Sequence, residues 1–264
     1  MKKFFAIISV LISCALCGCN SIIVDPGVSV DKSFTIGGNY DALNVSNAFD
    51  VTIDKDATDV TITVGENIMP NVIVEQVDGE LRIYCKPPVV AVNGTEFKAV
   101  IPYSSALKDV TLSGASRFNT QYPLVGKNVS LDLSGASRFI GDLSGSDTFI
   151  ELSGASRVKS VILAGDVNLT MSGASEADLT GVCVNLDLDM SGASRNVDNI
   201  VLKSYGLECS YCKGSLSGAS KAYIHCLKDI NVSLSGASDL HYTGDATTGD
   251  SSASGSSKIV HDRF

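Results

Sequence analysis

The chain has 264 residues, 24 of them glycine and none tryptophan, and a formal net charge of −9 at pH 7. This acidic balance argues against nucleic acid as a partner and against docking on an anionic surface by general electrostatics. Apolar residues with helical spacing are almost absent, so we expect strands and turns nearly throughout.

The first residues are typical of an exported lipoprotein. A two-lysine head precedes an apolar stretch that is too short for an ordinary membrane span, and Leu16-Cys17-Gly18-Cys19 closes it with the pattern of a lipobox. We expect residues 1–18 to be a signal peptide, with an uncleaved N-terminal helix as the alternative. Cys19 would then carry the lipid, and residues 19–32 would form a tether. No later apolar run is long enough to cross a bilayer, so the membrane contact is expected through this lipid only.

Residues 33–106 are β-rich but lack the repeat that follows. Asp78-Gly79 and Asn93-Gly94 each lie between strand-like runs, which is a hairpin signal. We therefore expect antiparallel hairpins that cap the open edge of the fold and continue into it.

Residues 107–260 contain an internal repeat, the tetrapeptide Ser-Gly-Ala-Ser, which we call the corner. It occurs seven times, at residues 113–116, 134–137, 153–156, 172–175, 191–194, 217–220 and 235–238. Apolar and polar residues alternate in front of each corner, as in Val110-Thr111-Leu112 and Leu131-Asp132-Leu133. Such a strand has one buried face and must stack on copies of itself.

These features predict an all-β fold, a right-handed parallel β-helix with Ser-Gly-Ala-Ser corners and a β-rich N-terminal cap. A left-handed hexapeptide helix would hold the repeat to multiples of six, which the corner positions do not follow. In each corner, Gly is expected to supply a left-handed backbone, Ala to fill a narrow interior space and Ser to hydrogen-bond backbone groups left by the bend.

The position after each corner is mostly basic and forms a candidate binding ladder for an acidic sugar or a peptide carboxylate. Its basic members are Arg117, Arg138, Arg157, Arg195 and Lys221. Glu176 and Asp239 occupy the same position in two rungs, so pairing within the ladder and simple solvation are the alternatives.

The corners preceded by an apolar-x-Leu pattern, together with runs such as Val60-Thr61-Ile62-Thr63-Val64, resemble the putative auto-transporter adhesin, head GIN domain family of Gram-negative envelope proteins. The resemblance covers roughly residues 34 to 260. It implies a right-handed β-helix at the cell envelope and an adhesive role, with no catalytic residues to carry over.

Five cysteines follow the lipobox, and we interpret them as small buried residues with at most one disulfide. They are Cys85, Cys183, Cys209, Cys212 and Cys226. Cys183 and Cys209 both lie eight residues before a corner, which predicts stacking on adjacent rungs. No zinc spacing accompanies them, so no metal site and no cofactor are expected.

The favoured function is a non-enzymatic outer-membrane lipoprotein of the cell envelope, facing the periplasm or the surface, that binds a glycan or protein ligand. The first alternative is a polysaccharide lyase or hydrolase that uses outward carboxylates, with Asp187 and Asp189 as the catalytic candidates. The second alternative is a structural envelope component that associates only with copies of itself; the sequence leaves the oligomeric state open.

Overall fold

The structure, a computed structural model, describes residues 22–86, 89–91, 96–196, 200–201 and 204–263. The predicted signal peptide, the lipid site Cys19 and the Asn93-Gly94 turn lie outside these residues. Strands make up 62% of the chain and helix 1%, so the predicted all-β class is confirmed.

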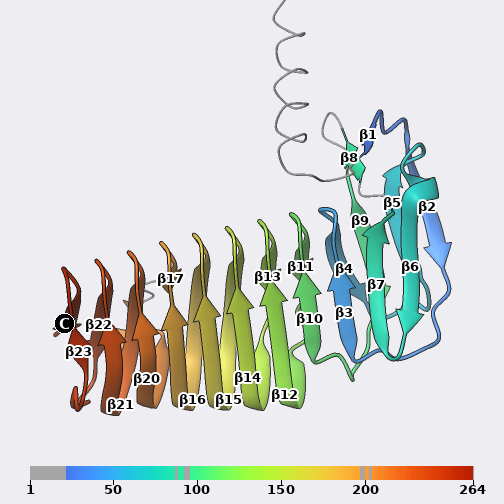
Figure 1. The fold of residues 1–264 in the computed structure, drawn as a ribbon. Helices are drawn as coiled ribbons and strands as arrows, with labels where there is room; N and C mark the ends of the chain where they lie inside the picture. Colours follow the sequence, from blue (N-terminus) through green and yellow to red (C-terminus); the bar gives the residue numbers. More distant parts are fainter. Residues whose placement is uncertain (1–21, 87–88, 92–95, 197–199, 202–203, 264) are drawn as a thin grey trace, which may run out of the picture.

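The body is a β-solenoid of about eight turns whose rungs stand in a row (Figure 1). Each rung pairs parallel with the next. The strands of the repeat are β10 (Asp109–Leu112), β11 (Arg117–Asn119), β12 (Leu124–Leu133), β13 (Arg138–Ile140), β14 (Leu143–Leu152), β15 (Arg157–Met171), β16 (Glu176–Met190), β17 (Arg195–Asn196), β20 (Leu207–Leu216), β21 (Lys221–Leu234), β22 (Asp239–Thr243), β23 (Ser252–Ala253) and β24 (Lys258–His261). The parallel β-helix is thus confirmed, and its right-handed sense stays a prediction.

The apolar residue before each corner stacks on its equivalent in the next rung, with every member of this column at most 3% exposed. The column consists of Leu112, Leu133, Leu152, Met171, Met190, Leu216 and Leu234. Burying one such side chain contributes roughly 1.5–3 kcal/mol, so this continuous apolar spine is the main driving force for stacking.

The corners stack through their backbones. Gly154 adopts φ +70°, in the left-handed region, and a Cβ placed on it would lie 2.5 Å from the carbonyl oxygen of Gly135 in the preceding rung. That oxygen accepts a hydrogen bond from the Ala155 backbone N–H at 2.7 Å. Only glycine satisfies both the dihedral angle and the close approach.

The prediction for the corner alanine is wrong, because the alanines are exposed and the second serine is the buried residue of the corner. The hydroxyl of Ser156 donates to the carbonyl of Leu133 in the preceding rung at 3.2 Å, and that of Ser220 donates to Ser217 in its own corner at 2.9 Å. The bend turns carbonyl groups inward, and a hydroxyl can satisfy them where a methyl group cannot. The equivalent hydroxyls of Ser175 and Ser194 are buried without a hydrogen-bond partner among the described residues.

The solenoid begins before the repeat, with rungs that are out of sequence order. β3 (Ala42–Val45) and β4 (Asp50–Asp54) form a rung that pairs parallel with β10 and β11 on one side. On its other side it pairs with β7 (Glu80–Cys85) and β9 (Lys98–Pro102), which come later in the chain.

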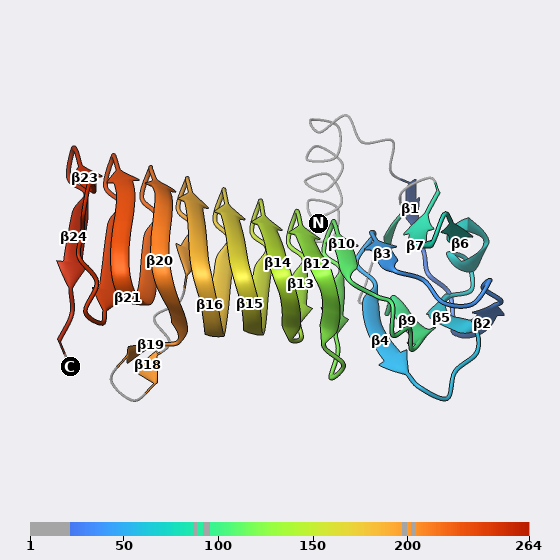
Figure 2. The same ribbon diagram turned by 90° about the horizontal axis from the view of Figure 1, so that it is seen from below.

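The first end of the solenoid carries antiparallel pairs, the blue and teal region of Figures 1 and 2. β6 and β7 pair around Asp78-Gly79, where both residues have positive φ, and β2 pairs with β5. The remaining elements are β1 (Ile22–Val24), β2 (Ser29–Phe34), β5 (Val60–Gly65), the 3₁₀ turn η1 (Met69–Asn71), β6 (Val72–Val77) and β8 (Val89–Ala91).

The predicted tether at residues 19–32 needs correction, because β1 and most of β2 fall within it. Val30 and Phe34 are partly buried against the core, and this contact holds β2 on β5. Val30 and Phe34 lie on one face of β2 by its period of two, although the exposed Lys32 stands between them.

The widest interval between corners contains a side excursion, in which β18 (Ile200–Val201) and β19 (Ser204–Tyr205) pair antiparallel beside β20 (Figure 2). A solenoid accommodates such an insertion without losing register, since rungs contact only their neighbours. Within the described part of the chain, no helix is long and apolar enough to cross a membrane.

Candidate functional site

The position after each corner forms a single column across the solenoid, as the sequence predicted. We call it the charged ladder; in spatial order it contains Arg117, Arg138, Arg157, Glu176, Arg195, Lys221 and Asp239. Each is the first residue of the strand that leaves its corner, and its side chain points outward because the next residue is buried.

The later part of the charged ladder is neutralised from within. Glu176 accepts ion pairs from Arg157 at 3.3 Å and from Arg195 at 3.1 Å, on the rungs before and after it. Lys221 pairs with Asp239 at 3.5 Å. These guanidinium and ammonium groups are already engaged, although exposed pairs of this kind contribute little to stability.

The earlier part of the charged ladder is different. Arg117 and Arg138 are exposed register partners, and among the described residues neither has an ion pair. Beside Arg138 lies a hollow of about 260 Å³, which we call the basic cleft. It is lined by Arg138, Phe139, Ile140, Arg157, Val158, Lys159, Glu176 and Asp178.

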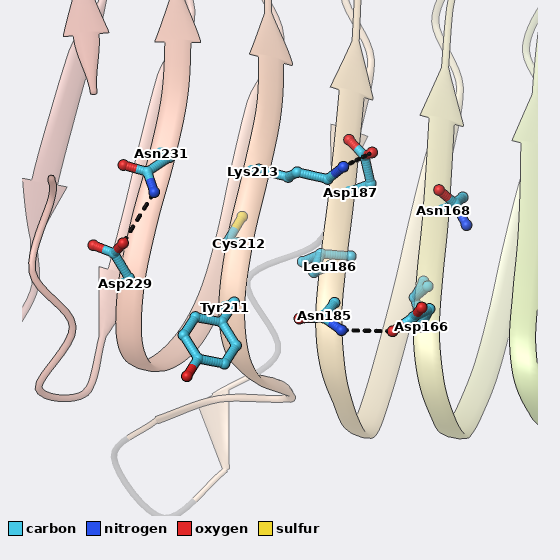
Figure 3. A pocket seen from close by; sticks show the side chains of 11 residues that line it. Asp166, Asn168, Asn185, Leu186, Asp187, Tyr211, Cys212, Lys213, Asp229 and Asn231 are labelled. Atoms are coloured by element: carbon cyan, nitrogen blue, oxygen red, sulfur yellow. Dashed lines mark hydrogen bonds and ion pairs between the residues drawn. The ribbon is translucent and has the colours of Figure 1, made fainter. Parts of the chain in front are cut away.

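A second hollow, of about 360 Å³, lies on the outward face of the strands that enter the corners (Figure 3). We call it the amide groove, because its walls are two columns of mostly amide and carboxylate side chains. One column is Asp166, Asn185, Tyr211 and Asp229, and the other is Asn168, Asp187, Lys213 and Asn231.

Hydrogen bonds fix most of these side chains. Asn185 donates to Asp166 at 2.6 Å, and Asn231 donates to Asp229 at 2.9 Å. Lys213 pairs with Asp187 at 3.0 Å, and this hydrogen bond raises the pKa of the lysine above its ordinary value. Figure 3 shows these interactions as dashed lines along the walls of the groove.

The two catalytic candidates share one outward face of β16 but hold separate partners. Asp187 pairs with Lys213, whereas Asp189 accepts hydrogen bonds from the Ser215 hydroxyl at 2.6 Å and its backbone N–H at 3.1 Å. Both partners belong to β20, the next strand on that face. These contacts join neighbouring rungs, and the enzymatic hypothesis stays a prediction.

The described cysteines are interior residues with free, buried thiols. Cys183, Cys209 and Cys226 are successive register partners, which confirms the predicted stacking of the first two. Burial raises the pKa of the Cys183 thiol to about 12 and that of Cys85 to about 11. In the part of the chain that the structure describes, no three His, Cys, Asp or Glu side chains are grouped to hold a metal ion.

Comparison with protein families assigns this architecture. The family model described as "Putative auto-transporter adhesin, head GIN domain" matches residues 39–246. The chain belongs to this family. The match includes both hollows and all the basic positions of the charged ladder, so these features lie within the adhesin-head domain itself. No curated protein matches the sequence.

Solved structures share the fold of this adhesin-head domain. A crystal structure from Parabacteroides distasonis, described as a putative adhesin, is 18% identical with a TM-score of 0.72, covering 92% of this chain and 98% of its own. Another from that organism, described as a putative lipid binding protein, has the same identity and TM-score and covers 92% and 100%. A putative adhesin from Parabacteroides merdae is 17% identical with a TM-score of 0.66, covering 92% and 99%.

The charged ladder of this adhesin-head domain was predicted from the sequence, whereas its amide groove was not. The signal was present, because the groove residues lie four and six positions before a corner serine and share the outward parity of Asp132 and Asp189. Tyr211 shares this outward position, but no other feature marks it in the sequence. Pairing of rungs brings it beside Asn185 and Asp229.

Proposed function

We propose that this chain is a non-enzymatic adhesin of the bacterial cell envelope that binds an acidic glycan at Arg117 and Arg138. Residues 1–18 would be removed as a signal peptide and the lipid on Cys19 would hold the protein at the outer membrane, on its periplasmic or its outer side. Membership of an adhesin family supports the adhesive role.

The observation that carries the proposal is the pair of unengaged arginines beside a hollow. Arg117 and Arg138 stack about one strand spacing apart, roughly 4.8 Å. A planar guanidinium binds a carboxylate with two parallel hydrogen bonds, and it keeps its charge at all physiological pH values. Two such groups in a row match a polymer that carries repeated carboxylates.

The basic cleft also offers an apolar floor. Phe139 and Val158 are buried beneath it, and Ile140 is partly exposed at its edge. A sugar ring presents apolar C–H faces as well as polar groups, so it can rest against Ile140 while a carboxylate reaches the arginines. The acidic net charge of the whole chain disfavours non-specific adsorption of polyanions, and binding must therefore come from this local cluster.

The test measures binding of the full-length chain, purified in neutral detergent, to polygalacturonate, heparin and poly-glutamate. We expect polygalacturonate to bind, and the double variant Arg117→Gln/Arg138→Gln to lose roughly tenfold or more in affinity, because a hydrogen bond to a charged group contributes about 1.5–3 kcal/mol. Raising the salt concentration should weaken binding through screening.

The matched control is Arg195→Gln/Lys221→Gln, which removes the same number of charges from the same ladder. Arg195 pairs with Glu176 and Lys221 with Asp239, and neither lines the basic cleft, so this variant should keep most of the affinity. Equal losses in the two variants would mean that only net charge matters, and the proposed site would then be wrong. Preference for poly-glutamate would make the ligand a peptide instead of a glycan.

The same samples separate the alternatives. Shortened or unsaturated polysaccharide products that disappear in Asp187→Asn or Asp189→Asn would establish the enzyme. Concentration-dependent assembly without any polysaccharide, measured by sedimentation, would establish the self-associating component.

A further inference from the structure

The amide groove differs from the basic cleft in both charge and chemistry. Its walls carry three carboxylates, Asp166, Asp187 and Asp229, against one lysine, Lys213. A polyanion would be repelled here by about 1 kcal/mol for each close charge pair in water. The groove lies on the part of each rung that enters a corner, whereas the charged ladder lies on the part that leaves one, and β15, β16 and β21 contain both parts.

An aromatic ring stands in this groove. Tyr211 is 43% exposed, and its register neighbours Asn185 and Asp229 have short side chains. The Lys228 ammonium on the next rung stands over the ring, with Nζ 5.1 Å from the ring centroid and 3.4 Å from the phenol oxygen, and this contact orients the ring. Figure 3 shows the ring broadside at the mouth of the hollow.

Planar polar groups line the groove around the ring. The Asn168 side chain has no hydrogen bond with any described residue, and Figure 3 shows it on the strand next to Asp187, on the side away from Lys213. Asp187 uses Oδ2 for Lys213, which leaves its Oδ1 to accept from a ligand. Asp229 accepts from Asn231 at one oxygen and from Thr247 at the other, so it is a fixed wall of the groove. An exposed ring flanked by planar donors and acceptors suits a ligand with an apolar face and several hydroxyl groups.

We propose that the amide groove is a second, independent ligand site that binds a neutral or amino-substituted pyranose unit of a carbohydrate. The C–H face of the sugar stacks on Tyr211. Its hydroxyl groups donate to Asp187 and exchange hydrogen bonds with the Asn168 amide. Two sites of opposite charge on different faces allow one solenoid to hold two chemically different carbohydrates.

The experiment titrates the full-length chain in neutral detergent with neutral tetrasaccharides of glucose, mannose and N-acetylglucosamine, followed by calorimetry. At least one of them should bind, with an affinity that changes little with salt concentration because the ligand is uncharged. Tyr211→Ala should weaken binding about tenfold or more, and Asn168→Ala should weaken it several-fold, within the range known for buried contacts of this kind.

Phe149→Ala is the matched control, because Phe149 is an exposed aromatic residue on the same outward face that does not line the groove. That variant should bind as the unaltered chain does, and Tyr211→Phe should retain most of the affinity, which also shows that the site tolerates substitution without unfolding. Failure of all three tetrasaccharides to bind, or equal effects of Tyr211→Ala and Phe149→Ala, would overturn the proposal.

The amide groove and the basic cleft can be tested separately. Tyr211→Ala should leave polygalacturonate binding unchanged, and Arg117→Gln/Arg138→Gln should leave tetrasaccharide binding unchanged. Loss of both ligands in one variant would contradict the independence of the sites.

Discussion

At the corners, seven successive rungs carry the same four residues, whereas the outward columns beside them change from rung to rung. The corner glycines have backbone atoms of the neighbouring rung within 3.3 Å of where a Cβ would stand, so a different residue there disturbs two rungs. An outward column faces water, where substitutions usually change stability by less than about 0.5 kcal/mol.

The contrast separates two kinds of position in a repetitive fold. The corner residues report the stacking of rungs, whereas the outward columns are free to carry a ligand site. Arg138 and Tyr211 both occupy outward columns, beside the basic cleft and the amide groove. The following predictions test this division between stacking and outward positions.

The largest effect is expected for Leu152→Ala in the apolar spine. Leu152 is 1% exposed, and the lost burial with the cavity left behind should lower the free energy of unfolding by roughly 2–5 kcal/mol. Urea denaturation measures the change. Phe149 lies on the same strand but is 45% exposed, so Phe149→Ala should lower the free energy of unfolding by less than about 1 kcal/mol. Similar losses at both positions would contradict the distinction between stacking and outward positions.

Gly154→Ala should lower the free energy of unfolding by roughly 2–3 kcal/mol. The left-handed dihedral costs an alanine about 1–2 kcal/mol, and its Cβ would also press on the Gly135 carbonyl and weaken the hydrogen bond there, which contributes about 1 kcal/mol. Ala155→Ser in the same exposed corner should be nearly neutral. If the two variants unfold at the same urea concentration, close backbone stacking does not govern the corners.

Alkaline pH should destabilise the interior selectively. The pKa of Cys183 is raised from 9.0 to about 12, so its contribution to stability is complete below about pH 9 and is lost as the pH rises toward 12. Within that pH window, each such thiol should lower the free energy of unfolding by about 1.4 kcal/mol per pH unit. Urea denaturation between pH 8 and pH 11 measures how the free energy of unfolding falls with pH. This fall should be shallower for Cys183→Ala than for the unaltered chain. An identical fall in both proteins would contradict the raised pKa of Cys183.

Glu176→Gln should change stability least, by less than about 1 kcal/mol, because its ion pairs are exposed. It should also free Arg157 and Arg195 and extend the row of unengaged arginines, so that polygalacturonate binds roughly fivefold more tightly, the equivalent of about 1 kcal/mol. The binding assay at low salt measures this gain. An unchanged affinity would show that pairing within the charged ladder does not limit ligand binding.

The strand class, the position of each corner and the inward residue of each strand could all be predicted from the sequence. These follow from local rules, since alternation with period two assigns the two faces and a repeated glycine marks each bend. The continuous Leu and Met column and the alignment of the charged ladder then follow from stacking equivalent corners, even where the interval between corners is longer.

Only the tertiary structure decided which residues work together. It placed the rung of β7 and β9 next to that of β3 and β4, out of chain order. The sequence Ser46-Asn47-Ala48 before Phe49 resembles a corner, but it does not say which rung stacks on this one. It also joined Arg157 and Arg195 to Glu176 and assembled the amide groove around Tyr211. These contacts depend on which rungs are neighbours and on the reach of each side chain, and local patterns in the sequence specify neither.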